Sequence, residues 1–278
     1  MNNTYMNFLT GHQTFMIRQS WLVKGINAIK KGRNIFSNQE LIQSIDYLGI
    51  GSNMVQSLRY WLRRFNLVDK EYQLTQECES LFSLDPLLTD YFTKWLLHIW
   101  NTENSPIWQL IHINDKVVNF DNDYLLNRLS QHLKERDKQI KDKTVKELIN
   151  VFINLYCKNN ENDPEKIIIS PLEPLSVIKQ KSEKEYQIAN KDSNQIHPAL
   201  VLYLIANKNE KKQLTILDAS DLIQKYINLD FLSIRKIIDQ LALKKFIVFD
   251  KSTGLNNITI INKEEKDLFF CWKYYHES

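Results

Sequence analysis

Apolar residues recur three and four positions apart along most of this chain, a spacing that predicts a mainly helical protein. The clearest case is the stretch SNMVQSLRYWLRRF, in which we expect Ser52 to cap a helix that continues to Phe65. One side of that helix is apolar throughout and predicts a buried stripe, formed by Met54, Val55, Leu58, Trp61, Leu62 and Phe65.

The opposite side of the same helix predicts an exposed surface for duplex DNA. Asn and Gln side chains can pair with adenine edges, whereas Arg can bind guanine or phosphate. No acidic residue occurs between Asp46 and Asp69 to repel a phosphate backbone. The predicted DNA-binding residues are Asn53, Gln56, Tyr60 and Arg63, with Arg59 and Arg64 on the flanks and Lys30, Lys31 and Arg33 upstream. The alternative is a three-helix core that binds no ligand.

Elements around this helix complete the pattern of a winged helix-turn-helix domain over residues 1–76. A first helix is expected to end at Gly32. The sequence Ser-Asn-Gln-Glu at 37–40 predicts a capping box before a second helix, and the glycine turn at 49–51 leads into the third. The stretch 67–75 has the pattern of a small β hairpin, which would form the wing.

Residues 77–160 predict a central helical domain. A broad apolar band at 87–99 indicates a helix buried on most sides, the central pillar of this domain. Asp121 is expected to cap a helix at Tyr124, and the sequence Thr-Val-Lys-Glu at 144–147 predicts another capping box. The polar segment 157–166 marks a domain edge, and residues 161–195 predict a connector with a hairpin of strands 177–180 and 185–189.

Residues 196–278 predict a winged-helix-like domain with a different partner. Helices are expected at 199–206, 220–227 and 231–244, followed by strands at 246–249 and 258–261, and the aromatic tail is expected to dock onto the body of the protein. The outward residues of the third helix are Leu232, Lys236, Asp239, Gln240 and Leu243. An acid and two leucines suit a protein partner better than phosphate. The predicted fold class is therefore mainly α with small β wings.

Composition narrows the class of protein. The chain has 278 residues, of which 43% are hydrophobic, enough for two or three domains. Its three widely spaced cysteines predict neither a disulfide framework nor a zinc ribbon, which fits a reducing cytoplasm. No apolar run approaches the about 18 residues that a membrane span needs. We therefore expect a cytoplasmic protein with no membrane contact.

The charge is distributed unevenly along the chain. Residues 1–68 contain eight Lys/Arg and two acids, a net charge of +6, whereas the remainder has 28 basic and 31 acidic residues, a net charge of −3. This asymmetry predicts one localised site for a polyanion near the amino terminus. The alternative is that some of these lysines only solvate helix surfaces.

Catalytic chemistry is not signalled by any motif in the sequence. A metal-dependent nuclease would need several carboxylates close together, and no spacing here indicates such a set or any other metal site. His12 and Arg18 are the weak catalytic candidates, because a His at the start of a basic helix can act as acid or base. The alternative is that residues 11–14 only cap and orient that helix. No cofactor is predicted; Mg²⁺ or Mn²⁺ would be required only by a nuclease.

The run GHQTFMIRQSWLVKG at 11–25 resembles the opening signature of the bacterial domain-of-unknown-function family 4007. The segments LTDYFTKWLLHIW and SPLEPLSVIKQKSEKEYQIAN are similar to the same family's mid-chain helix and its Pro-Leu connector. The resemblance implies a bacterial protein encoded among phage-defence genes, including DNA phosphorothioation systems, in which some relatives are proposed to nick DNA. In this chain the acids stand farther ahead of the connector, in ENDPEKIIISPL, than the family pattern has them.

Three functions are consistent with these observations. The first is a duplex DNA-binding component of a defence or DNA-modification system, with a protein partner on the carboxyl-terminal domain. The second is a DNA nickase of such a system. The third is a winged-helix transcription regulator, for which the sequence offers no obvious dimerisation helix.

Overall fold

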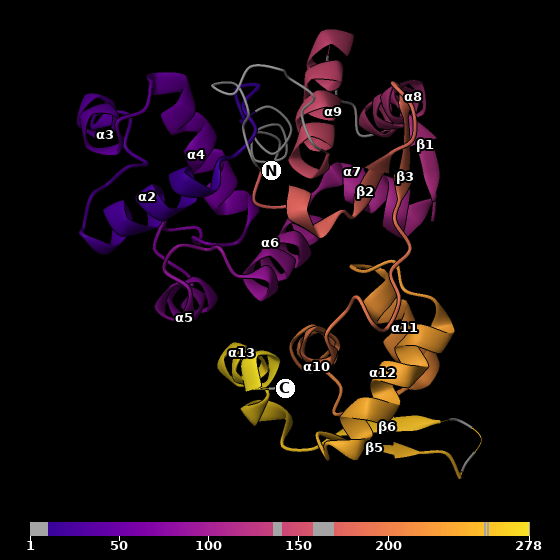
Figure 1. The fold of residues 1–278 in the computed structure, drawn as a ribbon. Coiled ribbons are helices and arrows are strands. Elements are labelled where there is room, and N and C mark those ends of the chain that lie inside the picture. The colour runs from indigo at the N-terminus through magenta and orange to yellow at the C-terminus, as the bar shows by residue number, and fades with distance from the viewer. Residues whose placement is uncertain (1–10, 136–140, 158–169, 253, 255, 278) are drawn as a thin grey trace. The chain divides into compact units, whose positions relative to one another are not determined.

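The structure is a computed structural model that describes residues 11–135, 141–157, 170–252, 254 and 256–277. The described part is mainly helical and contains two small three-stranded antiparallel sheets (Figure 1). The chain divides into two compact units, Met1–Ile188 and Ala189–Ser278, each with buried apolar residues of its own. The first unit thus includes what we expected as three separate parts, and that finer division stays a prediction. Most of the polar segment expected at 157–166 lies outside the described residues.

The first unit is built mostly of helices. They are α2 (Gln19–Lys30), α3 (Leu41–Leu48), α4 (Ser52–Arg64), α5 (Gln76–Leu84), α6 (Tyr91–Asn104), α7 (Pro106–Trp108), the π-helix η1 (Gln109–Asn114), α8 (Asn122–Lys134), α9 (Asp142–Tyr156) and the 3-10 helix η3 (Glu173–Leu175). In the described part of the chain, no helix has both the length and the apolar character that crossing a membrane requires.

Glycines end the first two of these helices, as the sequence predicts. Gly32 follows α2 with φ +72°, and Gly49 caps α3 with φ +63°, a conformation that residues with a Cβ rarely adopt. After α4, Val68 and Leu74 form an antiparallel bridge, so the expected hairpin at 67–75 is present in a very short form.

Both predicted capping boxes are wrong. Helix α3 begins after Glu40, whose side chain makes no capping bond, and Ser37 Oγ instead accepts from Gln39 N at 3.2 Å. Helix α9 begins at Asp142, so Thr144 lies inside its first turn. The pattern fails because a Ser or Thr hydroxyl can also serve a turn or a helix interior, and the local backbone decides which.

Helix α6 is the central pillar expected from the apolar band. Its residues from Phe92 to Thr102 are buried apart from Lys94, although Leu87 and Tyr91 at the start of the band are exposed. A buried polar cluster joins α6 to α7 and α9. The Tyr156 hydroxyl lies at the centre of that cluster, with three partners: His98 Nδ1 at 2.9 Å, Asn101 Nδ2 at 2.8 Å and Trp108 Nε1 at 2.8 Å.

The first sheet consists of β1 (Asn119–Asp121), β2 (Ile178–Gln180) and β3 (Glu185–Ile188), in the order β1-β3-β2 with antiparallel pairing. The β2–β3 hairpin is the one expected in the connector. Strand β1 was not predicted. Its Phe120 pairs with Tyr186, and the two rings stack with centroids 5.7 Å apart. The strand ends at Asp121, whose carboxylate accepts from Tyr124 N at 2.6 Å, which confirms the predicted cap.

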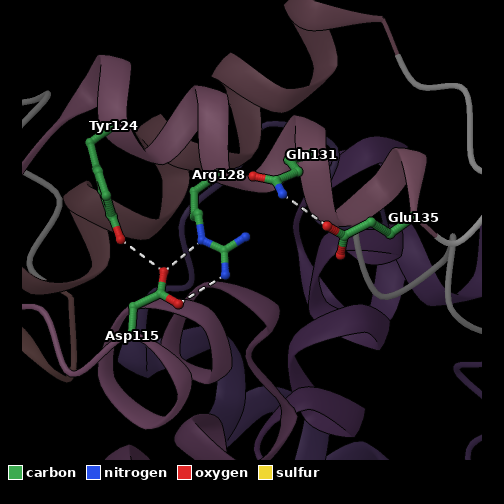
Figure 2. Close-up of polar contacts among 5 residues, drawn as sticks. All are labelled: Asp115, Tyr124, Arg128, Gln131 and Glu135. Atoms are coloured by element: carbon green, nitrogen blue, oxygen red, sulfur yellow. Dashed lines mark hydrogen bonds and ion pairs between the residues drawn. The ribbon is translucent and has the colours of Figure 1, made fainter.

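A salt bridge fixes α8 against the end of η1. Arg128 donates to both carboxylate oxygens of Asp115, from Nε at 2.7 Å and from one terminal nitrogen at 2.9 Å, and the Tyr124 hydroxyl donates to the same carboxylate at 2.8 Å (Figure 2). The bond from Arg128 lowers the pKa of Asp115. One turn further along α8, Gln131 donates to Glu135 at 2.9 Å.

The second unit contains α10 (Pro198–Asn207), β4 (Gln213–Thr215), α11 (Ile216–Gln224), α12 (Phe231–Leu243), β5 (Ile247–Asp250), β6 (Asn257–Ile260), the 3-10 helix η4 (Lys263–Glu265) and α13 (Leu268–Glu277). The strand order is β4-β6-β5. The expected helices are present, but β4 was missed, and α11 begins early because Thr215 and Asp218 form a capping box. The aromatic tail forms α13, which packs on α10 as predicted.

The amino end of α10 depends on a neutral histidine. His197 Nδ1 accepts from Ala199 N at 3.1 Å, which a protonated ring cannot do. Burial lowers the pKa of His197, and the nearby His276 lowers it further. The unfolded chain therefore takes up this proton more readily, so the associated stability is fully present above pH about 6.5 and is lost as the pH falls below that.

We expect the second unit to lose about 1 kcal/mol of unfolding free energy on acidification from pH 7 to 5 through loss of this cap. A His197→Asn protein keeps a good capping side chain and should lack this part of the pH dependence. Urea unfolding of both proteins at pH 7 and pH 5 gives the pH dependence of each unfolding free energy. Contributions from the histidines that both proteins contain cancel when the two pH dependences are subtracted. Parallel pH profiles would contradict the assignment.

Candidate nucleic-acid interface

Helix α4 has the inner side that its sequence predicts. Val55, Leu58, Trp61, Leu62 and Phe65 are buried against the rest of the first unit. The helix begins at Ser52, with Gly51 as its N-cap in an extended conformation, so the expectation that Ser52 is the cap is wrong. Two groups of α4 also bind the preceding segment. Ser57 Oγ and Trp61 Nε1 both donate to the carbonyl oxygen of Phe15, at 3.3 and 3.1 Å.

The predicted outer side of α4 is only partly exposed. Arg59, Tyr60 and Arg64 retain 6%, 4% and 4% of their accessible surface, so placing them on the outer face is wrong. Helical periodicity assigns them to the side opposite the apolar stripe, but it does not reveal which other segments cover that side.

Arg59 is covered by the loop between α2 and α3. Its Nε donates to the carbonyl oxygen of Ile35, and its terminal nitrogens donate to Asn38 Oδ1 at 2.8 Å and to the carbonyl oxygen of Ser37 at 2.9 Å. Burial lowers the pKa of Arg59, and Arg63 one turn away lowers it further. The guanidinium therefore positions this loop.

Tyr60 and Arg64 are covered by two other segments. The ring of His12 meets the Tyr60 ring edge-on at 5.6 Å, and burial raises the pKa of Tyr60. Arg64 donates to Asn101 Oδ1 at 3.2 Å and to the carbonyl oxygen of Asn104, both on α6. Asn104 Nδ2 donates back to the carbonyl oxygen of Arg64 at 3.0 Å. Arg64 thus joins α4 to α6.

The remaining predicted residues lie at the surface. Asn53 is exposed, and Gln56 and Arg63 are half-buried. Arg63 lies seven residues beyond Gln56 on the same side of α4, about 10 Å along the axis. Between them, the loop that binds Arg59 and the His12 ring that meets Tyr60 cover this side of the helix. The upstream cations are also exposed, namely Lys30 at the end of α2 and Lys31 and Arg33 just after it.

Aromatic rings hold several of these cations in place. A cation over a ring face is attracted by the ring's quadrupole, which restricts a long, flexible side chain. Three of the predicted surface cations form such pairs: Lys30 over Phe82 at 5.4 Å, Arg33 over Tyr47 at 5.3 Å and Arg63 over Tyr72 at 5.8 Å. The sequence analysis missed these rings, because each lies on a different element from its cation and no spacing links them.

The weak catalytic candidates, His12 and Arg18, each have local contacts of their own. His12 is 3% exposed, and its Nδ1 accepts from Thr14 N at 3.0 Å within a turn at residues 11–14. Arg18 is the N-cap residue of α2, with its guanidinium over the Trp21 ring at 5.1 Å. Among the described residues, no group of three or more His, Cys, Asp or Glu could hold a metal ion.

Comparisons with known proteins add a family and a fold. A family model described as protein of unknown function DUF4007 matches residues 9–275. A crystal structure of magnesium ion-bound SspB superposes with a TM-score of 0.79 at 16% identity, over 96% of this chain and 86% of that one. A second SspB crystal structure gives 0.76 at 17% identity with the same coverage. At such identities the likeness is evidence of the fold alone. Among curated protein sequences, none matches this chain.

Proposed function

This chain belongs to the DUF4007 family, and we propose that it is a duplex DNA-binding component of a bacterial anti-phage defence or phosphorothioation-type DNA-modification system. The family resemblance of its opening signature supports the defence context. The proposed DNA-binding surface consists of the predicted residues that are exposed or half-buried, namely Lys30, Lys31, Arg33, Asn53, Gln56 and Arg63.

One observation carries the proposal: cations of α2, α4 and the loop after α2 lie over aromatic rings, and these cations belong to a chain segment that is poor in acids. Residues 1–68 contain only Glu40 and Asp46 as acids. Cations that are already ordered lose less conformational entropy when they meet phosphate. Their attraction to a polyanion needs no base-specific contact, so it supports duplex binding of any sequence.

The order of elements supports a winged-helix arrangement in both units. Helices α2, α3 and α4 followed by the Val68–Leu74 bridge are consistent with a helix-turn-helix and a minimal wing. In the second unit the order is helix, strand, two helices and two strands. On α12, Leu232 and Leu243 are 77% and 83% exposed, which supports the proposal that a protein partner binds there.

The proposal predicts that the variant Lys30→Ala, Lys31→Ala, Arg33→Ala binds a fluorescent 20-base-pair duplex at least about tenfold more weakly at 100 mM salt. Each lost phosphate contact should also lower the slope of log affinity against log salt by about 0.9. Fluorescence anisotropy at several NaCl concentrations measures both quantities.

The matched control removes the same charge from another surface of the first unit. Lys179, Lys181 and Lys184 are exposed on and beside the β2–β3 hairpin, and their triple alanine variant should bind nearly as well as the parent. Equal losses in the two triple variants would reject the proposed surface. Absence of duplex binding by the parent protein at low salt would reject the function.

Nicking of DNA is the second candidate function. It is favoured by one of the similar structures, which is described as magnesium ion-bound. A supercoiled plasmid incubated with the protein and Mg²⁺ or Mn²⁺ distinguishes the two. Nicks that EDTA abolishes would establish an enzyme. A plasmid that stays supercoiled under conditions in which the duplex is bound would reject nicking and would be consistent with binding alone.

A further inference from the structure

Two aromatic rings from separate segments stack beside Arg63. Phe36 lies in the loop between α2 and α3, and Tyr72 lies in the turn between Val68 and Leu74. Their ring centroids are 4.3 Å apart with 13° between the planes, and 40% of Tyr72 is exposed. We call this pair the Phe36–Tyr72 stack. Tyr72 is therefore partly exposed, next to a cation.

A charged side chain fixes the backbone on both sides of each ring. Arg59 holds the carbonyl oxygens of the two residues that flank Phe36. Asp69 holds the two residues that flank Tyr72, because its carboxylate accepts from Glu71 N and Gln73 N, both at 2.9 Å. The stack is therefore pre-organised by contacts that its rings do not make themselves.

Tyr72 occupies a conformation that is costly for a tyrosine. Its φ is +62°, in the left-handed region that favours glycine. A glycine or asparagine would satisfy the turn with less strain. A large ring at such a position is consistent with a role for the ring itself at the surface.

The chemistry of the stack matches a nucleotide whose base is not paired. In an intact duplex both faces of each base are covered by neighbouring bases, so an aromatic ring can stack only on a base that has left the helix or lies at a break. Base–aromatic stacking is tolerant of sequence, and an adjacent arginine supplies the charge for the phosphate. Arg63 has that position, 5.8 Å from the Tyr72 ring centre. The same turn carries two acids, Asp69 and Glu71, and one base, Lys70, and the Asp69 carboxylate is bound by backbone N–H groups of the turn.

We propose that the Phe36–Tyr72 stack and Arg63 bind an unpaired nucleotide in DNA that the surrounding cations hold. This inference rests on the proposed DNA-binding function and adds a preferred substrate, duplex DNA with a displaced or unpaired base. Stacking on the aromatic pair provides the preference, and Arg63 binds the phosphate of the same nucleotide.

The experiment uses two duplexes of one sequence, one fully paired and one with a single bulged 2-aminopurine, whose fluorescence is quenched when it stacks. We expect the full chain to bind the bulged duplex roughly five- to tenfold more tightly, the lower end of what one stacked base contributes. The 2-aminopurine fluorescence should fall on binding. In the Tyr72→Leu variant the bulge preference and the quenching should both be lost. Affinity for the paired duplex should fall as well, because Arg63 loses the ring that orders it, so the ratio of the two affinities is the quantity compared.

Tyr72→Phe is the matched variant, because it keeps the stacking ring and should keep both effects. If Tyr72→Leu does not fold, the parent's preference and the quenching still decide the question. Equal affinities for the two duplexes, or a bulge preference that survives in a folded Tyr72→Leu protein, would overturn the inference and leave duplex binding intact. Failure to bind either duplex would instead overturn the proposed function itself.

Discussion

Replacing Tyr156 with phenylalanine is expected to lower the unfolding free energy by about 3 kcal/mol. The change removes one oxygen atom but leaves His98, Asn101 and Trp108 without the partner that they share. Buried polar groups that lose their partner keep the full cost of leaving water, about 1–3 kcal/mol each, less whatever local rearrangement recovers. Urea unfolding followed by circular dichroism measures the loss.

Tyr91→Phe is the control for this experiment. Tyr91 is the first residue of α6 and is exposed, so loss of its hydroxyl should change stability by less than about 0.5 kcal/mol. Equal stabilities of Tyr156→Phe and the parent would mean that the three partners find other hydrogen bonds. The cluster would then not be what connects α6, α7 and α9.

Replacing Arg59 with alanine should lower both stability and DNA affinity, for one structural reason. The carbonyl oxygens of Ile35 and Ser37 lose a charged donor, which should cost about 2–4 kcal/mol of unfolding free energy. Release of this loop would also displace Lys31 and Arg33 at its start, so duplex affinity should fall. Because Arg59 is buried and contacts no phosphate in this arrangement, the salt slope should stay near that of the parent.

Arg63→Ala is the matched comparison, one helical turn away. Arg63 is half-buried at the proposed surface, so its removal should lower the salt slope by about 0.9 with little loss of stability. Unfolding and salt-dependent anisotropy on both variants separate the two roles. An Arg59→Ala protein of normal stability with a reduced slope would show that Arg59 does bind phosphate.

The apolar positions of the helices, the Asp121 cap and the β2–β3 hairpin could be predicted from the sequence, whereas strands β1 and β4 and the starts of α3, α4 and α9 could not. The inner residues of α4 and α12 follow helical spacing and are buried as expected. Strands β1 and β4 have three residues each, and each forms on the edge of a hairpin that lies far along the chain. Three residues carry too little periodicity to be recognised without that partner.

The structure moves three of the predicted DNA-binding residues, Arg59, Tyr60 and Arg64, from the surface to the interior. An acid-poor, basic amino-terminal segment is a property of the sequence, and its exposed cations are the ones that we retain. Arg59 and Arg64 are arginines of α4 like Arg63, yet both bind protein carbonyl oxygens. A guanidinium on a long side chain can reach either solvent or a carbonyl group, so its own position on the helix does not decide between them.

The sequence by itself determined which residues prefer burial, where most helices run and where positive charge accumulates, because these depend on neighbours within a few positions. Only the tertiary structure decided which polar face of α4 is covered, and which rings meet Phe36, Arg33 and Arg63. Those outcomes depend on loops that pack from distant parts of the chain. Local periodicity contains no information about such contacts.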